Sequence, residues 1–219
     1  MSRSASGRSL GQLLVDAGRL IGEHPIILIP AVIPSFWAFI APYIGLLSPA
    51  ILTTGYFGLG FGAWRTLVFL LIYVPLLILS QSATVILVRA ATQGDAPSLQ
   101  SGLEESISRF VPLFTASMLA GIIVALASLV FIFPALVAVF FLWYIVQVII
   151  VNDESALGAL RASFGFSATY AGETFAIVLA ALVISFAFSY IPVVGPLLMI
   201  PTTSYFVALT TLFYLERAS

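Results

Sequence analysis

Three long apolar stretches, at residues 25–88, 110–152 and 174–215, make up most of this chain, and short polar segments separate them. A helix that crosses a bilayer needs about 20 predominantly apolar residues. Divided at their prolines and glycines, the stretches predict six spans: residues 26–45, 66–88, 112–130, 134–151, 173–190 and 196–215. Because the runs are continuously apolar and do not alternate, they predict helices and not the strands of a barrel.

One part of the first stretch does not suit a helix. Residues 48–64 hold four glycines among aromatic side chains, and glycines at this density disfavour a helix. We expect a loop on the outer face here. The span before it is longer than the apolar core of a signal peptide, so we expect it to be retained as the first membrane span.

The polar segments carry apolar residues at helical spacing. They predict short amphipathic helices over residues 9–21, 98–110 and 155–166, which would lie in the membrane interface beside the spans. Asp95 and Asp153 precede the second and third of these helices, where N-cap residues belong. The residues expected to contact the leaflet or a partner are Leu99, Leu103, Ile107, Leu157, Leu160 and Phe164, with Arg109 and Arg161.

The same order of elements recurs along the chain. An interfacial helix precedes a membrane hairpin in three units of about residues 9–88, 98–151 and 155–215. The predicted fold is therefore an all-α, polytopic membrane helical bundle. It forms one integral membrane domain over residues 1–219, with six transmembrane helices arranged as three repeats.

Composition supports the membrane assignment, and charge orients the chain. The 219 residues are 61% hydrophobic and 8% charged, whereas a soluble domain has about 25% charged residues. All eight basic residues are arginines, and with six spans Arg65 alone falls on the side opposite the others. The positive-inside rule then predicts a multi-pass protein of the cell membrane with both termini in the cytoplasm.

Residues around the fourth span resemble a known family. Pro134 begins the span, Asp153 and Glu154 follow it, and the run ALGALRASF extends from Ala156 to Phe164. This pattern resembles the membrane domain attached to some glycerophosphodiester phosphodiesterases and its stand-alone multi-span relatives, which usually have glycine after the proline where this chain has alanine. The resemblance implies a membrane architecture and no activity, because the catalytic domain of those enzymes is a separate soluble domain.

Reactive side chains are few. The sequence has no cysteine, which excludes disulfides, thiolate metal sites and cysteine nucleophiles. The one histidine, His24, lies at a predicted membrane interface, without a partner that the sequence identifies. The adjacent acids Glu104 and Glu105, like Asp153 and Glu154, do not face one another on a helix, and they suit a helix N-terminus. We therefore expect no catalytic residue, no cofactor and no metal site.

Uncharged polar residues inside the spans are the remaining candidates for a site. A polar path between the repeats would use Gln81, Thr84, Gln147, Thr202, Thr203 and Ser204. Hydrogen bonding between helices is the commoner role of such residues. The prolines of the first span, Pro30, Pro34 and Pro42, interrupt its hydrogen-bond ladder and indicate a kink more than a binding site.

Two functional hypotheses, and a weaker third, follow from these features. The interfacial helices and the lack of buried charge favour a non-enzymatic protein with a membrane-organising, scaffolding or accessory-subunit role. Its partners would be membrane lipids and another protein or a second copy of the chain, and no nucleic acid. The polar residues favour a passive transporter or channel for a neutral or lipid-like small solute. An enzyme acting on lipid head groups would use Glu104, Glu105, Asp153 and Arg161.

Overall fold

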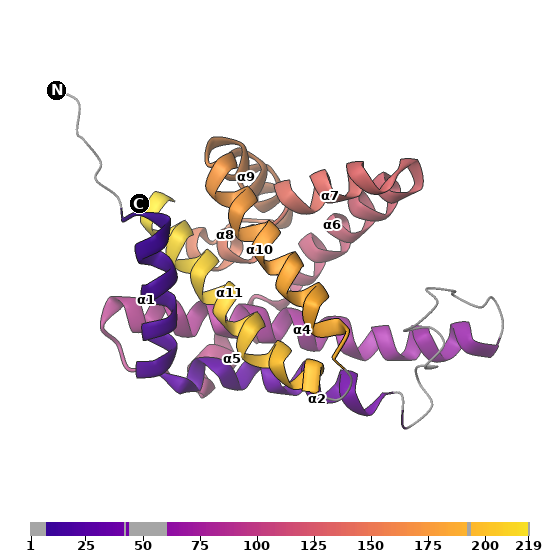
Figure 1. The fold of residues 1–219 in the computed structure, drawn as a ribbon, viewed down its shortest axis with the longest axis horizontal. Helices are drawn as coiled ribbons and strands as arrows, with labels where there is room; N and C mark the ends of the chain where they lie inside the picture. The colour runs from indigo at the N-terminus through magenta and orange to yellow at the C-terminus, as the bar shows by residue number, and fades with distance from the viewer. Residues whose placement is uncertain (1–7, 42, 44–60, 192–193, 219) are drawn as a thin grey trace.

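The computed structural model describes residues 8–41, 43, 61–191 and 194–218, which form helices and no strand, as predicted. Figure 1 shows α4 running the length of the molecule, with α1 and the C-terminal end of α11 together at one end. In chain order the helices are α1 (Leu10–Glu23), η1 (Pro25–Leu28), α2 (Ile29–Ile40), α4 (Phe61–Gln93), α5 (Leu99–Ser108), α6 (Phe110–Val130), α7 (Ile132–Phe141), α8 (Ile145–Asn152), α9 (Ala156–Thr169), α10 (Ala171–Ser189) and α11 (Val194–Ala218).

Helical segments long and apolar enough to cross a membrane coincide with five of the six predicted spans. They are Trp64–Gln93, Phe110–Val130, Ile132–Asn152, Ala171–Phe188 and Leu197–Ala218. The first predicted span differs, because its described part is only η1 and α2. It passes the same test only when joined to α1 across a bend of 100°. That bend precedes Pro25, whereas Pro34 lies inside α2. Most of the predicted loop over 48–64 lies outside the described residues.

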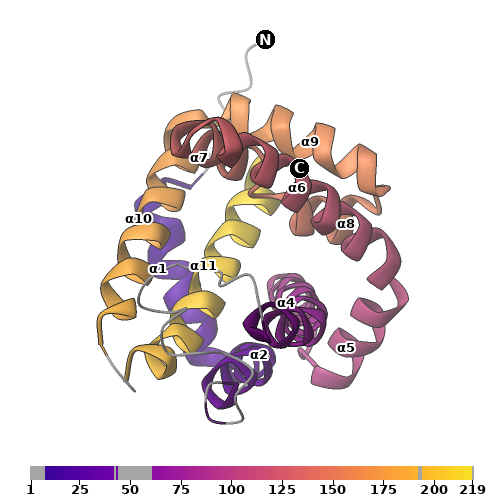
Figure 2. The same ribbon diagram turned by 90° about the vertical axis from the view of Figure 1, so that its right-hand side faces the viewer.

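The centre of the bundle is formed by the C-terminal halves of α4 and α11 together with α8. Figure 2 looks along α4 and shows α4 and α11 in the interior, with α6, α7, α9 and α10 around them. Half of the most apolar window of α4 and of α11 is buried, against 11% of that of α6. The buried side chains include Val85, Leu87, Val88, Val148, Ile149, Ile150, Ala208, Leu209 and Phe213.

Serines, and not the predicted aspartates, begin the short helices. Ser9 and Ser155 occupy the N-cap positions of α1 and α9, and their hydroxyl oxygens accept from backbone N–H groups three residues on, at 3.3 and 3.2 Å. Ser98 occupies the same position at α5, without a side-chain bond. The prediction for Asp95 and Asp153 was wrong because these serines lie nearer the helices. Asp153 instead ends α8 in a left-handed conformation, with φ 57°.

The helices α5 and α9 turn small residues toward the bundle. On α5, Gly102 and Ser106 are buried, and a Cβ atom at Gly102 would lie 3.4 Å from the Leu87 side chain of α4. Of the large apolar side chains predicted to contact the leaflet, Leu160 packs against the buried core, whereas the others do not belong to that core. Ile107, Leu157 and Phe164 are 61%, 63% and 52% exposed, and Leu99, Leu103 and Leu160 are half-buried.

Candidate functional site

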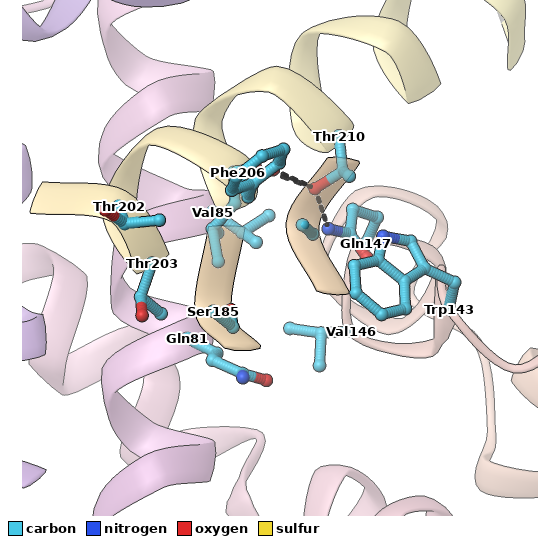
Figure 3. A pocket seen from close by; sticks show the side chains of 12 residues that line it. Gln81, Val85, Trp143, Val146, Gln147, Ser185, Thr202, Thr203, Phe206 and Thr210 are labelled. Carbon is cyan, nitrogen blue, oxygen red and sulfur yellow. Dashed lines mark hydrogen bonds between the residues drawn. The ribbon is translucent and has the colours of Figure 1, made fainter. Parts of the chain in front are cut away.

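A pocket of about 240 Å³ lies between α4, α8, α10 and α11, beside the turn that joins α7 to α8 (Figure 3). No lining residue carries a charge, and six of them end in an amide or a hydroxyl group. On α4, α10 and α11 the lining residues recur at helical spacing, so each helix contributes one face. They are Gln81, Val85, Trp143, Val146, Gln147, Ala181, Ser185, Thr202, Thr203, Phe206, Val207 and Thr210.

The pocket lies within the depth of the candidate spans. Gln81, Gln147 and Thr203 are each more than one helical turn from both ends of their segments. Seven of the twelve lining residues are only half-buried, so the pocket opens to the molecular surface. Its volume is far above the roughly 10–15 Å³ that one water requires and just below the roughly 300 Å³ at which typical ligand pockets begin. The space therefore suits a small molecule.

Gln147 is one of two buried polar residues of the pocket, with 4% of its surface exposed against 2% for Thr210. Its Nε2 donates a hydrogen bond of 2.9 Å to the hydroxyl oxygen of Thr210. The Thr210 hydroxyl in turn donates to a backbone carbonyl of α11, at 2.8 Å to Phe206 or 3.0 Å to Val207. Because that proton is already used, Thr210 can only accept from the amide. This arrangement leaves the buried Oε1 of Gln147 without a partner.

Two further polar side chains supply unused hydrogen-bonding groups. Gln81 and Thr203 are half-buried, and the structure records no hydrogen bond from either side chain to another described residue. In Figure 3 the amide of Gln81 extends from α4 toward the α8 side of the pocket. Gln81 offers both a donor and an acceptor, and the hydroxyl group of Thr203 can act as either. The pocket can therefore bind a ligand through several hydrogen bonds without a charge.

The part of the pocket wall next to Gln147 is formed where a candidate membrane span is interrupted. The predicted span over 134–151 is interrupted at Leu142–Tyr144, where the backbone leaves the helix between α7 and α8. The buried hydroxyl group of Ser163 on α9 accepts from the Tyr144 N–H at 3.1 Å and donates to the Phe141 carbonyl at 2.9 Å. Irregular backbone is tolerated at membrane depth where protein groups satisfy it or where it lines a cavity. Both conditions hold here, since Trp143 lines the pocket.

Four of the six residues predicted for a polar path meet in this pocket: Gln81, Gln147, Thr202 and Thr203. Thr84 and Ser204 do not line it. Thr84 is buried and donates to the Ser80 carbonyl at 2.9 Å, and Ser204 is buried with an unpaired hydroxyl oxygen.

The predicted path did not include Trp143, Ser185 and Thr210, which also line the pocket. Thr210 lies seven residues after Thr203, and that spacing places both on one helix face. This signal is present in the sequence. For Ser185 we find no such signal, because only the packing of α10 against α11 brings it to the pocket.

The charged residues considered for head-group chemistry do not form one site. Glu105 lies 3.6 Å from Arg89 and 3.5 Å from Arg109, and Asp153 lies 2.6 Å from Arg109. Both arginines also donate to backbone carbonyls in the last turn of α8, at 2.9 and 3.1 Å. These groups therefore close the end of a helix, where carbonyls lack partners and cations are favoured. Arg161 has no contact with this cluster.

No group of three or more histidine, aspartate and glutamate side chains that could hold a metal ion occurs in the described part of the chain. His24 lies at the bend between α1 and η1, where its backbone N–H closes α1 by donating to the Leu20 carbonyl at 2.9 Å. No protein-family model, curated protein or solved structure matches this chain.

Proposed function

We propose that this membrane protein binds a small uncharged, hydrogen-bonding solute in the pocket and lets it cross the membrane passively. The observation that carries the proposal is the buried and unpaired Oε1 of Gln147. An unsatisfied buried acceptor costs about 1–3 kcal/mol, and hydrocarbon offers no replacement partner. A solute that donates a hydrogen bond to this oxygen, once the amide turns toward the pocket, would recover that free energy.

The lining restricts the chemistry of the solute. A charged solute would lose its hydration without meeting an opposite charge, because no acidic or basic side chain lines the pocket. A wholly apolar solute would leave the amide of Gln81 and the Oε1 atom of Gln147 unpaired. A neutral polyol or amide matches the mixture of donors and acceptors, and the small volume favours one with few atoms.

The break between α7 and α8 also supports a transport role. Many transporters bind their substrates at discontinuous membrane helices, near the middle of the bilayer. Here Trp143 and Gln147 lie at or just after such a break and both line the pocket. A change in the turn would alter the shape of the pocket without unfolding either flanking helix.

The proposal includes the membrane topology: six spans in three repeats, with both termini in the cytoplasm. In this arrangement α1, η1 and α2 supply the first crossing. An ion pair of 2.7 Å between Arg8 and Glu216 supports termini on one side, because it joins the start of α1 to the end of α11. Arg65, near the start of α4, lies at the opposite end of that helix from Arg89.

A second candidate function is the membrane-organising or accessory role. It is favoured by the exposed apolar side chains of Ile107, Leu157 and Phe164 on the two short helices. Under this proposal Ile107→Asp and Leu157→Asp would abolish the deformation of liposomes or the capture of a partner. The two functions separate experimentally, because these changes lie outside the pocket and leave solute permeation intact.

The transport proposal is tested with purified protein in liposomes, by stopped-flow light scattering under a gradient of glycerol or urea. Wild-type protein is expected to raise the permeability above that of empty liposomes. Gln147→Met removes both polar atoms of the amide with little change in volume, and it should lower this permeability. Gln93→Met makes the same change at the exposed end of α4 and should have no effect. Permeability equal to that of empty liposomes for both solutes would refute the proposal.

A further inference from the structure

A second cavity, of about 470 Å³, is a groove between α6, α7 and α9 and shares no residue with the polar pocket. Apart from Arg161, every residue that lines the groove is apolar. The lining consists of Ile123, Ala138, Phe141, Leu142, Leu160, Arg161 and Phe164. Such a surface buries hydrocarbon and presents one cationic group at its edge.

Arg161 differs from the other arginines that the structure describes. It is exposed, and the structure records no ion pair, hydrogen bond or aromatic contact for it. Glu154 lies seven residues before Arg161, and the described part of the chain shows no ion pair between the two. The other described arginines all have such partners: Arg8, Arg19, Arg65, Arg89, Arg109 and Arg217.

We propose that this groove binds an anionic phospholipid, with one acyl chain along its apolar floor and the phosphate paired with Arg161. The planar guanidinium group matches a phosphate through two parallel hydrogen bonds. A zwitterionic lipid would also bring an ammonium group to the site, and no acidic side chain lines the groove to receive it. The net charge of an anionic lipid matches the unpaired guanidinium group that lines the groove.

The position of the groove connects the lipid with the polar pocket. Phe141 and Leu142 line the groove, and the next residue, Trp143, lines the pocket. The break between α7 and α8 thus contributes to both cavities, from adjacent residues. The rings of Phe141 and Phe164 stack with centroids 4.2 Å apart, which joins the floor of the groove to α9. A lipid in the groove would rest against the same turn that shapes the pocket.

The binding of the lipid is tested by native mass spectrometry of the purified protein with added phosphatidylglycerol or phosphatidylcholine. The wild-type protein should retain phosphatidylglycerol preferentially. Arg161→Gln should lower its apparent affinity about five-fold, the effect of one cation near a membrane surface. Arg161→Lys should keep most of the preference. Arg19→Gln removes another exposed arginine, from α1, and should change nothing.

A second variant tests the apolar part of the site. Ala138→Phe fills the groove and should weaken phosphatidylglycerol binding while Arg161 remains, whereas Ala125→Phe, on an exposed position of α6 outside the groove, should not. Circular dichroism and gel filtration establish that each variant is folded. Equal retention of the two lipids by the wild-type protein, or an unchanged preference in folded Arg161→Gln, would overturn the proposal.

Discussion

The hydroxyl oxygen of Ser163 lies 3.1 Å from the backbone nitrogen of Tyr144, and it spans the break between α7 and α8. Ser163 belongs to α9, a short helix that follows α8 in the chain. The residue that bonds to the backbone at the break therefore comes from outside the interrupted span. One side chain therefore satisfies a backbone donor, and through its own proton also an acceptor on the other side of the turn. The conformation of a pocket wall thus depends on a helix that lies outside the pocket.

Replacing Ser163 with alanine should destabilise the protein by about 1–3 kcal/mol, because it leaves a buried donor and a half-buried acceptor unpaired. The measurement is thermal unfolding of the purified protein in detergent, followed by circular dichroism. Ser108→Ala is a matched control, since the Ser108 hydroxyl is exposed and bonds only to a carbonyl of its own helix. Equal melting temperatures for the two variants would contradict the bridging role.

The hydrogen bond between Gln147 and Thr210 predicts a measurable coupling. We expect a double-mutant cycle with Gln147→Met and Thr210→Val to give a coupling free energy of roughly 0.6–2 kcal/mol, the range found for polar contacts inside membrane bundles. Both changes nearly preserve volume, so packing contributes little. Unfolding in detergent supplies the four free energies. Additive effects would mean that the bond does not form in solution.

Arg109 should stabilise the end of α8. Arg109→Gln removes its ion pair with Asp153 and its bond to a carbonyl of the last helical turn, and we expect a loss of about 1–3 kcal/mol. The rate of amide hydrogen exchange should rise more in α8 than in the other helices. The matched change Arg19→Gln breaks an exposed pair with Glu23, which contributes little. A loss as small for Arg109→Gln as for Arg19→Gln would count against the helix-end role.

The proposed topology is tested with single cysteines, because the natural sequence contains none. Arg65→Cys and Gln93→Cys lie at opposite ends of α4. In intact cells a membrane-impermeant maleimide should label the first and not the second, and it should label both after the membrane is opened. Labelling of Gln93→Cys alone in intact cells would reverse the proposed orientation.

Much of the fold is readable from the chain. Five predicted spans coincide with described helices, and the division between α6 and α7 falls at Phe131, beside the predicted break. The three short helices also occur where helical spacing predicts them. The internal repeat, the first of the six spans and the resemblance to the membrane domain of glycerophosphodiester phosphodiesterases stay predictions. The N-caps were misplaced because serine and aspartate both suit the position, and the chain offers both.

The sequence by itself determined that this is a helical membrane protein, because long uncharged apolar runs cannot be solvated by water and can satisfy their backbone only as helices. It also placed uncharged polar residues within those spans. Only the tertiary structure decided which of them meet. Gln81, Gln147, Ser185 and Thr203 come from four different segments, and the packing of those segments brings them around one pocket. Likewise, the hydroxyl of Ser163 reaches the break at Leu142–Tyr144 only because α9 folds back onto it. The local pattern of apolar and polar residues determines where each helix forms. Contacts between distant segments depend instead on how the side chains of different helices fit together.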